Sequence, residues 1–178
     1  SLGRLEELAM IYASIKGDLN CEIKHKKIFT MAGDHGVVEE GVSAFPQQVT
    51  AQMIQNFIEG GAAINVLARH VGAEVIVVDC GVAFPLDEKQ CLKVKKVGLG
   101  TKNMAMGPAM SREEAIRAIE AGIELVEEEL AGGLDIIGTG DMGIGNTTPS
   151  SAILAVLGKM DVEVATGRGT GLDDETLQ

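Results

Sequence analysis

The stretch GTGDMGIGNTTP, residues 138–149, decides how this chain is interpreted. It follows a short apolar run at residues 134–137, typical of a buried strand, and precedes a helix-like run at residues 150–157. Four glycines in residues 138–145 let the backbone approach a ligand closely and adopt positive φ. A capping residue among positions 146–148 and the following proline suit the start of a helix, whose amino end favours an anion. The stretch therefore predicts a strand, a glycine-rich loop and a helix that together bind a phosphate group.

Two other interpretations of this stretch remain open. Its first six residues match G-x-G-x-x-G, the dinucleotide fingerprint, and an acidic residue follows about 20 positions later at Asp161 or Glu163. In that motif the helix begins within the glycines, whereas Gly145, Asn146 and Pro149 would interrupt a helix here. The stretch could also be a plain connection between a strand and a helix, without a ligand.

Outside this stretch, apolar runs of strand length alternate with helical patterns. Such alternation predicts a parallel sheet with helices on both faces. We therefore expect one α/β domain over residues 1–178, a three-layer α/β/α sandwich with a mainly parallel, doubly wound sheet. The expected strands are residues 27–32, 74–79, 134–137 and 162–165, with a half-exposed edge strand at 92–97. We expect residues 74–79 and 134–137 to be interior strands.

Two long helices are expected between the strands. One covers residues 49–70, with a weak point at the glycine pair 60–61. The other covers residues 111–130, where Ser111 and Glu114 form a capping box. Its apolar positions 116, 119, 123, 126 and 130 give one stripe, which we expect to pack in the core.

Ligands of open α/β sheets bind beyond the carboxyl ends of the strands. The loops expected there are residues 33–36, 80–82, 138–146 and 166–171, and three of the four are rich in glycine. This repetition predicts that the binding site lies at this edge of the sheet.

Composition narrows the possible partners. A net charge of −11 argues against a nucleic-acid partner, because phosphate backbones are bound by basic patches. The apolar runs are too short for a membrane span. The three cysteines form no C-x-x-C pair and the three histidines no H-x-x-x-H pair, so we expect no metal, no cofactor and a cytoplasmic setting. Both ends look like interrupted helical patterns, so we expect the chain to be part of a longer one.

Several segments, taken together and in this order, are similar to those of the nicotinate-nucleotide–dimethylbenzimidazole phosphoribosyltransferase family. The resemblance covers essentially the whole chain, and the G-D-H-G-V and G-x-G-x-M-G-I-G-N-T-T-P segments are highly specific. The segments are residues 1–6, 32–37, 40–42 with Pro46, 107–111 and 138–149. The resemblance implies a transfer of ribose-5-phosphate from nicotinate mononucleotide to 5,6-dimethylbenzimidazole or a related base. It gives α-ribazole phosphate and nicotinate, in the synthesis of the lower ligand of cobalamin, and is carried out by a homodimer.

The same resemblance assigns candidate site residues. Substrate-binding positions are Gly140, Gly143, Asn146, Thr147 and Gly169 around the nucleotide, and Phe45, Pro46, Met53 and Met142 near the acceptor base. Asp141 stands where many members carry glutamate and is the one candidate catalytic residue. Phe45 stands where some members carry serine, so a hydrogen bond to the base is lost there.

The family's chains are about twice as long as this one. Their presumed general base, a glutamate in a G-E-G segment, and a lysine for the nucleotide phosphate lie in a part that this sequence lacks. We therefore expect the 178-residue chain to be inactive alone. A non-catalytic phosphosugar- or nucleotide-binding domain is the alternative. For Asp34 and His35 we expect a loop-bracing role, because His35 has no Ser or Cys partner in a recognisable triad.

Overall fold

The computed structural model describes residues 2–86, 92–169, 171, 173 and 175. Four parallel strands form one sheet in the order β3-β2-β1-β4. They are β1 (Lys26–Gly33), β2 (Glu74–Gly81), β3 (Leu92–Val94) and β4 (Ile136–Met142). The runs expected at 27–32 and 74–79 are thus confirmed as strands, and β3 is the expected edge strand, although it ends at Val94 rather than at residue 97.

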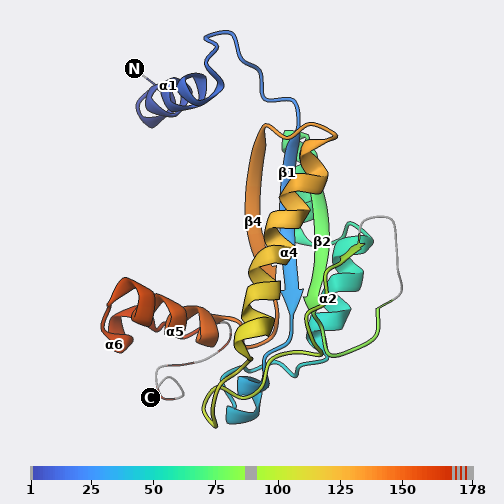
Figure 1. Ribbon diagram of the computed structural model, residues 1–178, viewed down its shortest axis with the longest axis vertical. Coiled ribbons are helices and arrows are strands. Elements are labelled where there is room, and N and C mark those ends of the chain that lie inside the picture. The colour runs from blue at the N-terminus through green and yellow to red at the C-terminus, as the bar shows by residue number, and fades with distance from the viewer. Residues whose placement is uncertain (1, 87–91, 170, 172, 174, 176–178) are drawn as a thin grey trace.

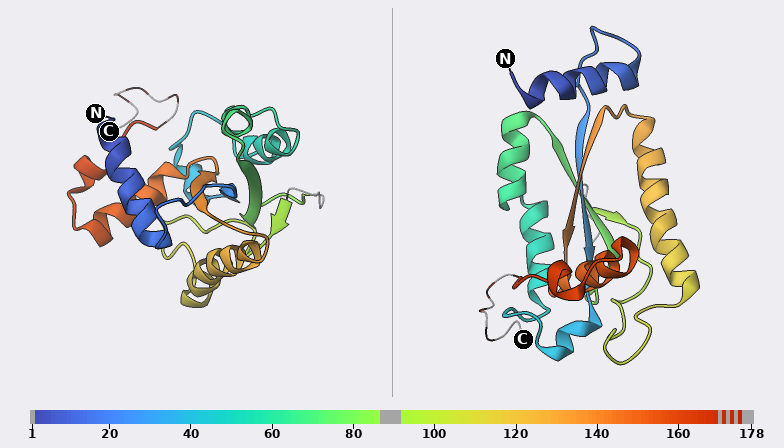
Figure 2. Two further views of the ribbon diagram at one scale, coloured as in Figure 1. Left: turned by 90° about the horizontal axis from the view of Figure 1, so that it is seen from above. Right: turned by 90° about the vertical axis from the view of Figure 1, so that its left-hand side faces the viewer.

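Helices cover both faces of the sheet, which confirms the three-layer prediction (Figure 2). On one face lie α2 (Val49–Ile58) and α3 (Ala63–Val71), which are separated at the glycine pair 60–61, as predicted. On the other face lies α4 (Arg112–Leu130), which begins with the predicted capping box: the Ser111 hydroxyl accepts the Glu114 amide at 3.2 Å, and Glu114 accepts the Ser111 amide at 2.7 Å.

The core is split into two layers by the sheet. Ala32, Val77 and Val82 pack with Ile54 of α2, and Phe29, Ile76 and Val78 pack with Leu125 of α4. Because successive side chains of a strand point to opposite faces, a strand buried on both sides must be apolar throughout. This is why β1 and β2 are nearly continuous apolar runs.

The remaining elements lie at the two ends of the strands (Figure 1). Helix α1 (Arg4–Lys16) stands beyond the amino ends. The 3₁₀ helix η1 (Gly36–Glu40), α5 (Thr147–Gly158) and α6 (Val162–Ala165) lie near the carboxyl ends. Among the described residues, no helix is long and apolar enough to cross a membrane.

Four expectations from the sequence are wrong. Residues 162–165 form the short helix α6 rather than a strand, because the Asp161 carboxylate accepts the Glu163 amide at 2.9 Å and starts a helical turn. Strand β4 begins at Ile136 and continues through the first two glycines to Met142, so the loop is only residues 143–146. It also lies at the edge of the sheet, not in its interior.

The fourth concerns the apolar stripe of α4. Of the five stripe positions, Val126 packs against the core as expected, but Ile116, Ile119, Ile123 and Leu130 are 43–67% exposed. Ala121 and Leu125 are the buried residues of the helix. The helical period correctly predicts which apolar residues share one side of α4. It does not predict whether another layer of the protein covers that side.

Candidate functional site

The candidate site lies where the direction of strand order reverses. Strands β1 and β4 are neighbours in the sheet but far apart in the sequence, which makes the gap between their carboxyl ends a topological switch point. Strand β1 leads there into Asp34 and His35, and β4 leads into the loop of residues 143–146 and the start of α5. The sheet therefore brings the G-D-H-G-V segment beside the glycine-rich stretch.

A cavity of about 430 Å³, here called the loop cavity, opens beside this loop. Six of the residues assigned from the family resemblance line it: Phe45, Met53, Met142, Gly143, Asn146 and Thr147. The others in its wall are Val42, Ser43, Val49, Ile144 and Gly145. Most of these side chains are apolar, which suits a flat ring with few polar substituents.

A second cavity of about 290 Å³, here called the helix cavity, lies at the amino end of α5. It shares Val42 and Thr147 with the loop cavity and adds the guanidinium-bearing Arg168. The rest of its wall is Met104, Thr148, Ser151, Ala152, Val162, Thr166 and Gly167. Because a helix amino end and an arginine both favour anions, this cavity is the better of the two for a phosphate group.

Several backbone amides of the loop already have partners within the protein. The Ile144 amide donates to the Thr50 hydroxyl at 3.0 Å, and the Asn146 amide donates to the Gly143 carbonyl at 3.0 Å. In the described part of the chain, the amides of Gly145 and Thr147 donate to no protein acceptor. An anion at the start of α5 would therefore find fewer free backbone amides than the glycine pattern suggested.

Thr50 is a residue that the sequence interpretation missed. It is fully buried in α2, and its hydroxyl ties the loop to that helix. A hydroxyl on an otherwise apolar helix face is a weak signal, because threonine also packs in cores as a small β-branched residue. Only its partner on the loop, 94 positions away, shows its role.

The predicted residues outside the two cavity walls lie close by. Asp141 accepts a hydrogen bond from the Asn146 side-chain amide, so Asn146 engages Asp141 rather than capping α5. A β-carbon at Gly169 would be 3.4 Å from the Thr147 hydroxyl oxygen, which places this glycine at the wall that both cavities share. Pro46 starts the turn into α2 with its carbonyl, which accepts the Val49 amide at 3.0 Å. Gly140 lies within β4, paired with Thr30 of β1.

Asp34 joins the ends of β1 and β2. Its amide donates to the Gly81 carbonyl at 3.0 Å, its carbonyl accepts the Thr101 amide at 3.0 Å, and its carboxylate accepts the Ala83 amide at 2.8 Å. It is 1% exposed, and its second carboxylate oxygen has no partner among the described residues. These contacts agree with the loop-bracing role expected from the sequence.

His35 lies between Asp34 and the glycine-rich loop. A β-carbon placed on Gly143 would be 3.1 Å from its Nε2 atom, so the imidazole packs against the loop backbone. Its Nδ1 atom is buried and has no partner in the described part of the chain. Burial lowers the pKa of His35, and the nearby carboxylates of Asp34 and Asp141 oppose this only in part. The imidazole is therefore neutral near pH 7.

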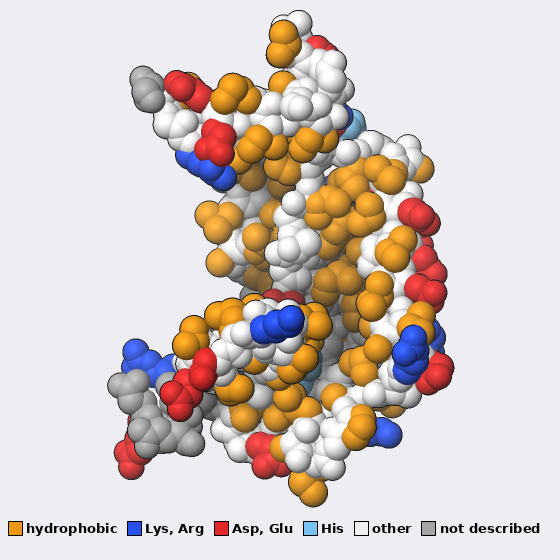
Figure 3. Space-filling view, turned by 60° about the vertical axis from the view of Figure 1, so that its left-hand side comes forward, with side chains coloured by type: hydrophobic (Ala, Val, Ile, Leu, Met, Phe, Trp, Pro, Cys, Tyr) orange, Lys and Arg blue, Asp and Glu red, His pale blue; other side chains and the backbone are white. Residues whose placement is uncertain are grey.

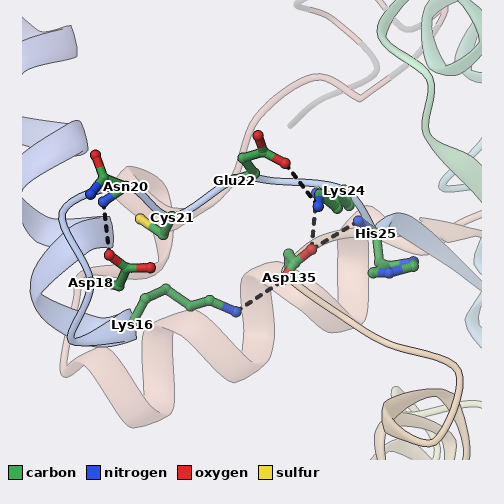
Figure 4. A pocket seen from close by; sticks show the side chains of 8 residues that line it. All are labelled: Lys16, Asp18, Asn20, Cys21, Glu22, Lys24, His25 and Asp135. Atoms are coloured by element: carbon green, nitrogen blue, oxygen red, sulfur yellow. Dashed lines mark hydrogen bonds and ion pairs between the residues drawn. The ribbon is translucent and has the colours of Figure 1, made fainter.

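A further hollow, of about 580 Å³, is at the opposite end of the sheet (Figure 4). Its centre is the Asp135 carboxylate, which accepts the Lys16 ammonium at 2.9 Å and the amides of Lys24 and His25, each at 2.9 Å. The two amides and the ammonium hold the pKa of Asp135 well below its usual range. This carboxylate is fully engaged in attaching the α1 segment to the sheet, so the hollow is architectural.

The dinucleotide interpretation does not fit this geometry. The first two glycines of its motif, Gly138 and Gly140, lie inside β4, and α5 begins only after the fourth glycine. In a dinucleotide site the helix would instead open within the glycines. The described residues also contain no group of three or more His, Cys, Asp or Glu that could hold a metal ion.

Comparison with known proteins identifies the family of this chain. A family model described as a phosphoribosyltransferase matches residues 1–178. The nicotinate-nucleotide–dimethylbenzimidazole phosphoribosyltransferase of Geotalea uraniireducens is 59% identical over 177 residues, and that of Geobacter sulfurreducens is 56% identical over 177. Each match covers 99% of this chain but 50% of the relative, so the chain spans about half the length of these relatives.

A solved structure gives the same result. The crystal structure of CobT from Thermus thermophilus superposes with a TM-score of 0.95 at 46% sequence identity, and the match covers 99% of this chain and 53% of that one. The family match over the whole length, the identities above one half and this superposition together show that the chain belongs to the nicotinate-nucleotide–dimethylbenzimidazole phosphoribosyltransferase family.

Proposed function

We propose that this chain carries the nucleotide- and base-binding part of a phosphoribosyltransferase. The donor is nicotinate mononucleotide and the acceptor is 5,6-dimethylbenzimidazole or a related base. The observation that carries the proposal is the pair of adjoining cavities at the switch point, one mostly apolar and the other at a helix amino end with an arginine.

The two cavities have different roles in this proposal. The phosphate occupies the helix cavity, near the Thr147 amide and Arg168. The aromatic acceptor base lies in the loop cavity against Phe45, Met53 and Met142, where the phenyl ring and the thioethers provide polarisable, apolar contact. Thr147 belongs to both walls, so a ribose that joins phosphate and base would span it.

The reaction requires alignment of the two reactants more than chemical activation of either one. The acceptor nitrogen attacks C1′ of the ribose as the bond from C1′ to the pyridinium nitrogen breaks, and nicotinate leaves with the electron pair. Attack from the opposite face converts the β-linkage into an α-linkage. The protein must hold the two reactants in line and accept the N–H proton of the azole.

Asp141 is the candidate for that proton in this chain, and a weak one. Its carboxylate is already hydrogen-bonded to Asn146, and it is one methylene shorter than the glutamate at this position in many family members. No G-E-G segment occurs in the sequence. We therefore propose that the 178-residue chain binds the donor but transfers the ribosyl group slowly or not at all.

A product assay tests this proposal. The chain and the full-length Geotalea uraniireducens relative are each incubated with nicotinate mononucleotide and dimethylbenzimidazole, and α-ribazole phosphate is measured by chromatography. A positioned general base contributes about 10²–10⁴ in rate, so the chain should fall short of the relative by at least that factor. Calorimetry should still detect weak binding of the mononucleotide, and Arg168→Ala should weaken it.

The test also separates the alternative, a non-catalytic nucleotide-binding domain. Binding without any product in either protein would favour that alternative. Product formation by the chain at a rate near that of the relative would refute the assignment of the missing base. No binding at all would refute the cavity assignment.

Assembly and setting are part of the same proposal. We propose a cytoplasmic homodimer as the working form of the full-length protein, checked by light scattering at several concentrations. We propose no nucleic-acid partner, because the net charge of −11 would repel a phosphate backbone.

A further inference from the structure

A third cavity, of about 240 Å³ and here called the α4 cavity, lies between α4 and the carboxyl ends of β1 and β2. Its wall also includes part of the connection from β3 to α4, residues 97–102. Among the described residues, none belongs both to this wall and to that of the loop cavity or the helix cavity. The proposed reaction uses no residue of the α4 cavity, so its purpose is a separate question.

The sequence of α4 explains why this cavity exists. Positions 114, 118, 121 and 125 recur every three or four residues and therefore share one side of the helix. On this side Leu125 packs on β1 and β2, whereas Ala118 contributes only a methyl group to the cavity wall. Four glycines and a second alanine in the wall leave further space. The exposed stripe of α4, which borders the apolar hollow in Figure 3, lies on the other side of the helix.

Two polar atoms of the residues at the β1 end of the cavity have no protein partner in the described part of the chain. Asp34 is 1% exposed, and its carboxylate accepts the Ala83 amide at 2.8 Å through Oδ2, which leaves Oδ1 unpaired. The Nδ1 atom of the adjacent His35 is also buried and unpaired. Buried polar atoms are nearly always hydrogen-bonded, and an unpaired one is costly, most of all on a charged group. These two atoms therefore indicate where a ligand would donate hydrogen bonds.

The rest of the wall determines the size and charge of such a ligand. Val97, Leu99 and Met110 line the cavity with apolar side chains. Lys102 and Glu114 carry opposite charges that offset one another, so the Asp34 carboxylate is the remaining charge of the wall and favours a cation. The volume is below the roughly 300–1,000 Å³ of sites for drug-sized ligands, so it suits a single ring rather than a nucleotide.

We propose that the α4 cavity is a binding site for a single-ring cation of the amidine or guanidine class. Such a cation is planar and carries several N–H groups at one end, which donate to Asp34 Oδ1 and His35 Nδ1. The imidazole can accept at Nδ1 because a neutral ring has one nitrogen without a hydrogen. The ring of the ligand lies against the apolar part of the wall. An anion of the same shape would instead be repelled by the Asp34 carboxylate.

Calorimetry with benzamidine as the probe tests the proposal on the 178-residue chain. We expect one-to-one binding with a dissociation constant of about 1 mM or lower, which ligand efficiency allows for a molecule of this size. Benzoate, which has the same shape and the opposite charge, should not bind measurably. The titration is repeated with nicotinate mononucleotide present. The dissociation constant of benzamidine should not rise with the mononucleotide concentration, because the α4 cavity is separate from the two cavities of the proposed reaction.

Two variants locate the bound probe. In Asp34→Asn the side-chain oxygen can still accept the Ala83 amide, so the NH₂ group replaces Oδ1 and opposes the N–H groups of the ligand. Affinity should fall by about tenfold or more, as expected for the loss of a hydrogen bond between charged groups. Ala118→Leu fills the cavity from α4 with a residue that favours a helix, and it should abolish binding. Ala131→Leu is the matched control, because it adds the same atoms at the exposed carboxyl end of α4 and should leave binding unchanged.

Circular dichroism verifies that each variant is folded, and Ala118→Leu decides the test if Asp34→Asn is not. Absence of benzamidine binding to the unchanged chain would overturn the proposal. So would equal binding of benzoate, or undiminished binding of benzamidine to the folded Ala118→Leu variant. Competition by nicotinate mononucleotide would place the probe in the site of the reaction and would overturn it as well. Failure of the mononucleotide to bind would count against the proposed function alone, since the benzamidine titration does not depend on it.

Discussion

Replacing Gly143 by alanine should distinguish close packing of the loop from simple flexibility. A β-carbon at this position would stand 2.0 Å from the Gly33 carbonyl oxygen and 3.1 Å from His35 Nε2. The first neighbour is backbone at the end of β1, which cannot rotate away as a side chain could. The loop must therefore move by about 1.4 Å to restore an ordinary contact of at least 3.4 Å. Overpacking of this kind costs about 1–3 kcal/mol.

We expect the upper part of that range, about 2–3 kcal/mol, because the crowded carbonyl belongs to Gly33, the last residue of β1, which is paired with Gly81 of β2. For a chain of this size, such a loss lowers Tm by roughly 5–10 °C. Mononucleotide binding should weaken as well, since Gly143 lines the loop cavity. The same geometry means that Gly143→Val would disturb the fold, so it is no clean test of ligand approach.

Gly122→Ala is the matched control. Gly122 lies inside α4, and a β-carbon there would meet no atom within 4 Å. Alanine in a helix interior is more favourable than glycine by about 0.5–1 kcal/mol, so this variant should be slightly more stable than the parent chain. Urea unfolding with unchanged m-values measures both effects. A Gly143→Ala variant that is as stable as the parent and binds the mononucleotide equally well would refute the packing argument.

Three further predictions follow from individual contacts. Ser111→Ala removes the hydroxyl that accepts the Glu114 amide and should lower the free energy of unfolding by about 1 kcal/mol, measured by urea denaturation; a change below about 0.3 kcal/mol would contradict the role of the capping box. Burial lowers the pKa of His35, so the unfolded chain binds its proton more tightly, and the stability from the neutral imidazole should decline as the pH falls below about 6.5. His35→Asn should lessen that decline. An identical pH profile of stability in the variant would show that His35 is not its cause. Burial also raises the pKa of the Cys80 thiol to about 11, so iodoacetamide at pH 8 should label Cys80 in urea but hardly in the native chain, as read by mass spectrometry; rapid native labelling would show that the thiol is accessible.

The sequence predicted those parts of the fold that depend on local patterns. Strands β1 and β2 are found from their apolar runs, because burial on both faces requires apolar residues throughout. The start of α4 is found from Ser111 and Glu114, because the capping box acts within four residues. The edge position of β4 and the exposure of the α4 stripe could not be found this way. Both depend on which layers surround an apolar segment, and an isoleucine has the same sequence pattern whether or not that layer is present.

The glycine-rich stretch shows the same division within twelve residues. The sequence pattern alone assigns all four glycines to one flexible loop, but in the structure they serve two different purposes. Gly138 lies in β4, where a β-carbon would come within 3.3 Å of Ile28 on the neighbouring strand. Gly145 has a φ of +78° and a would-be β-carbon 2.8 Å from Val38, so it allows the turn itself. The hydroxyl of Thr50, which accepts the Ile144 amide of the loop, comes from a helix 94 positions earlier. A motif can therefore locate a binding loop, whereas the contacts that hold that loop in its binding shape come from distant parts of the chain and need the fold to be seen.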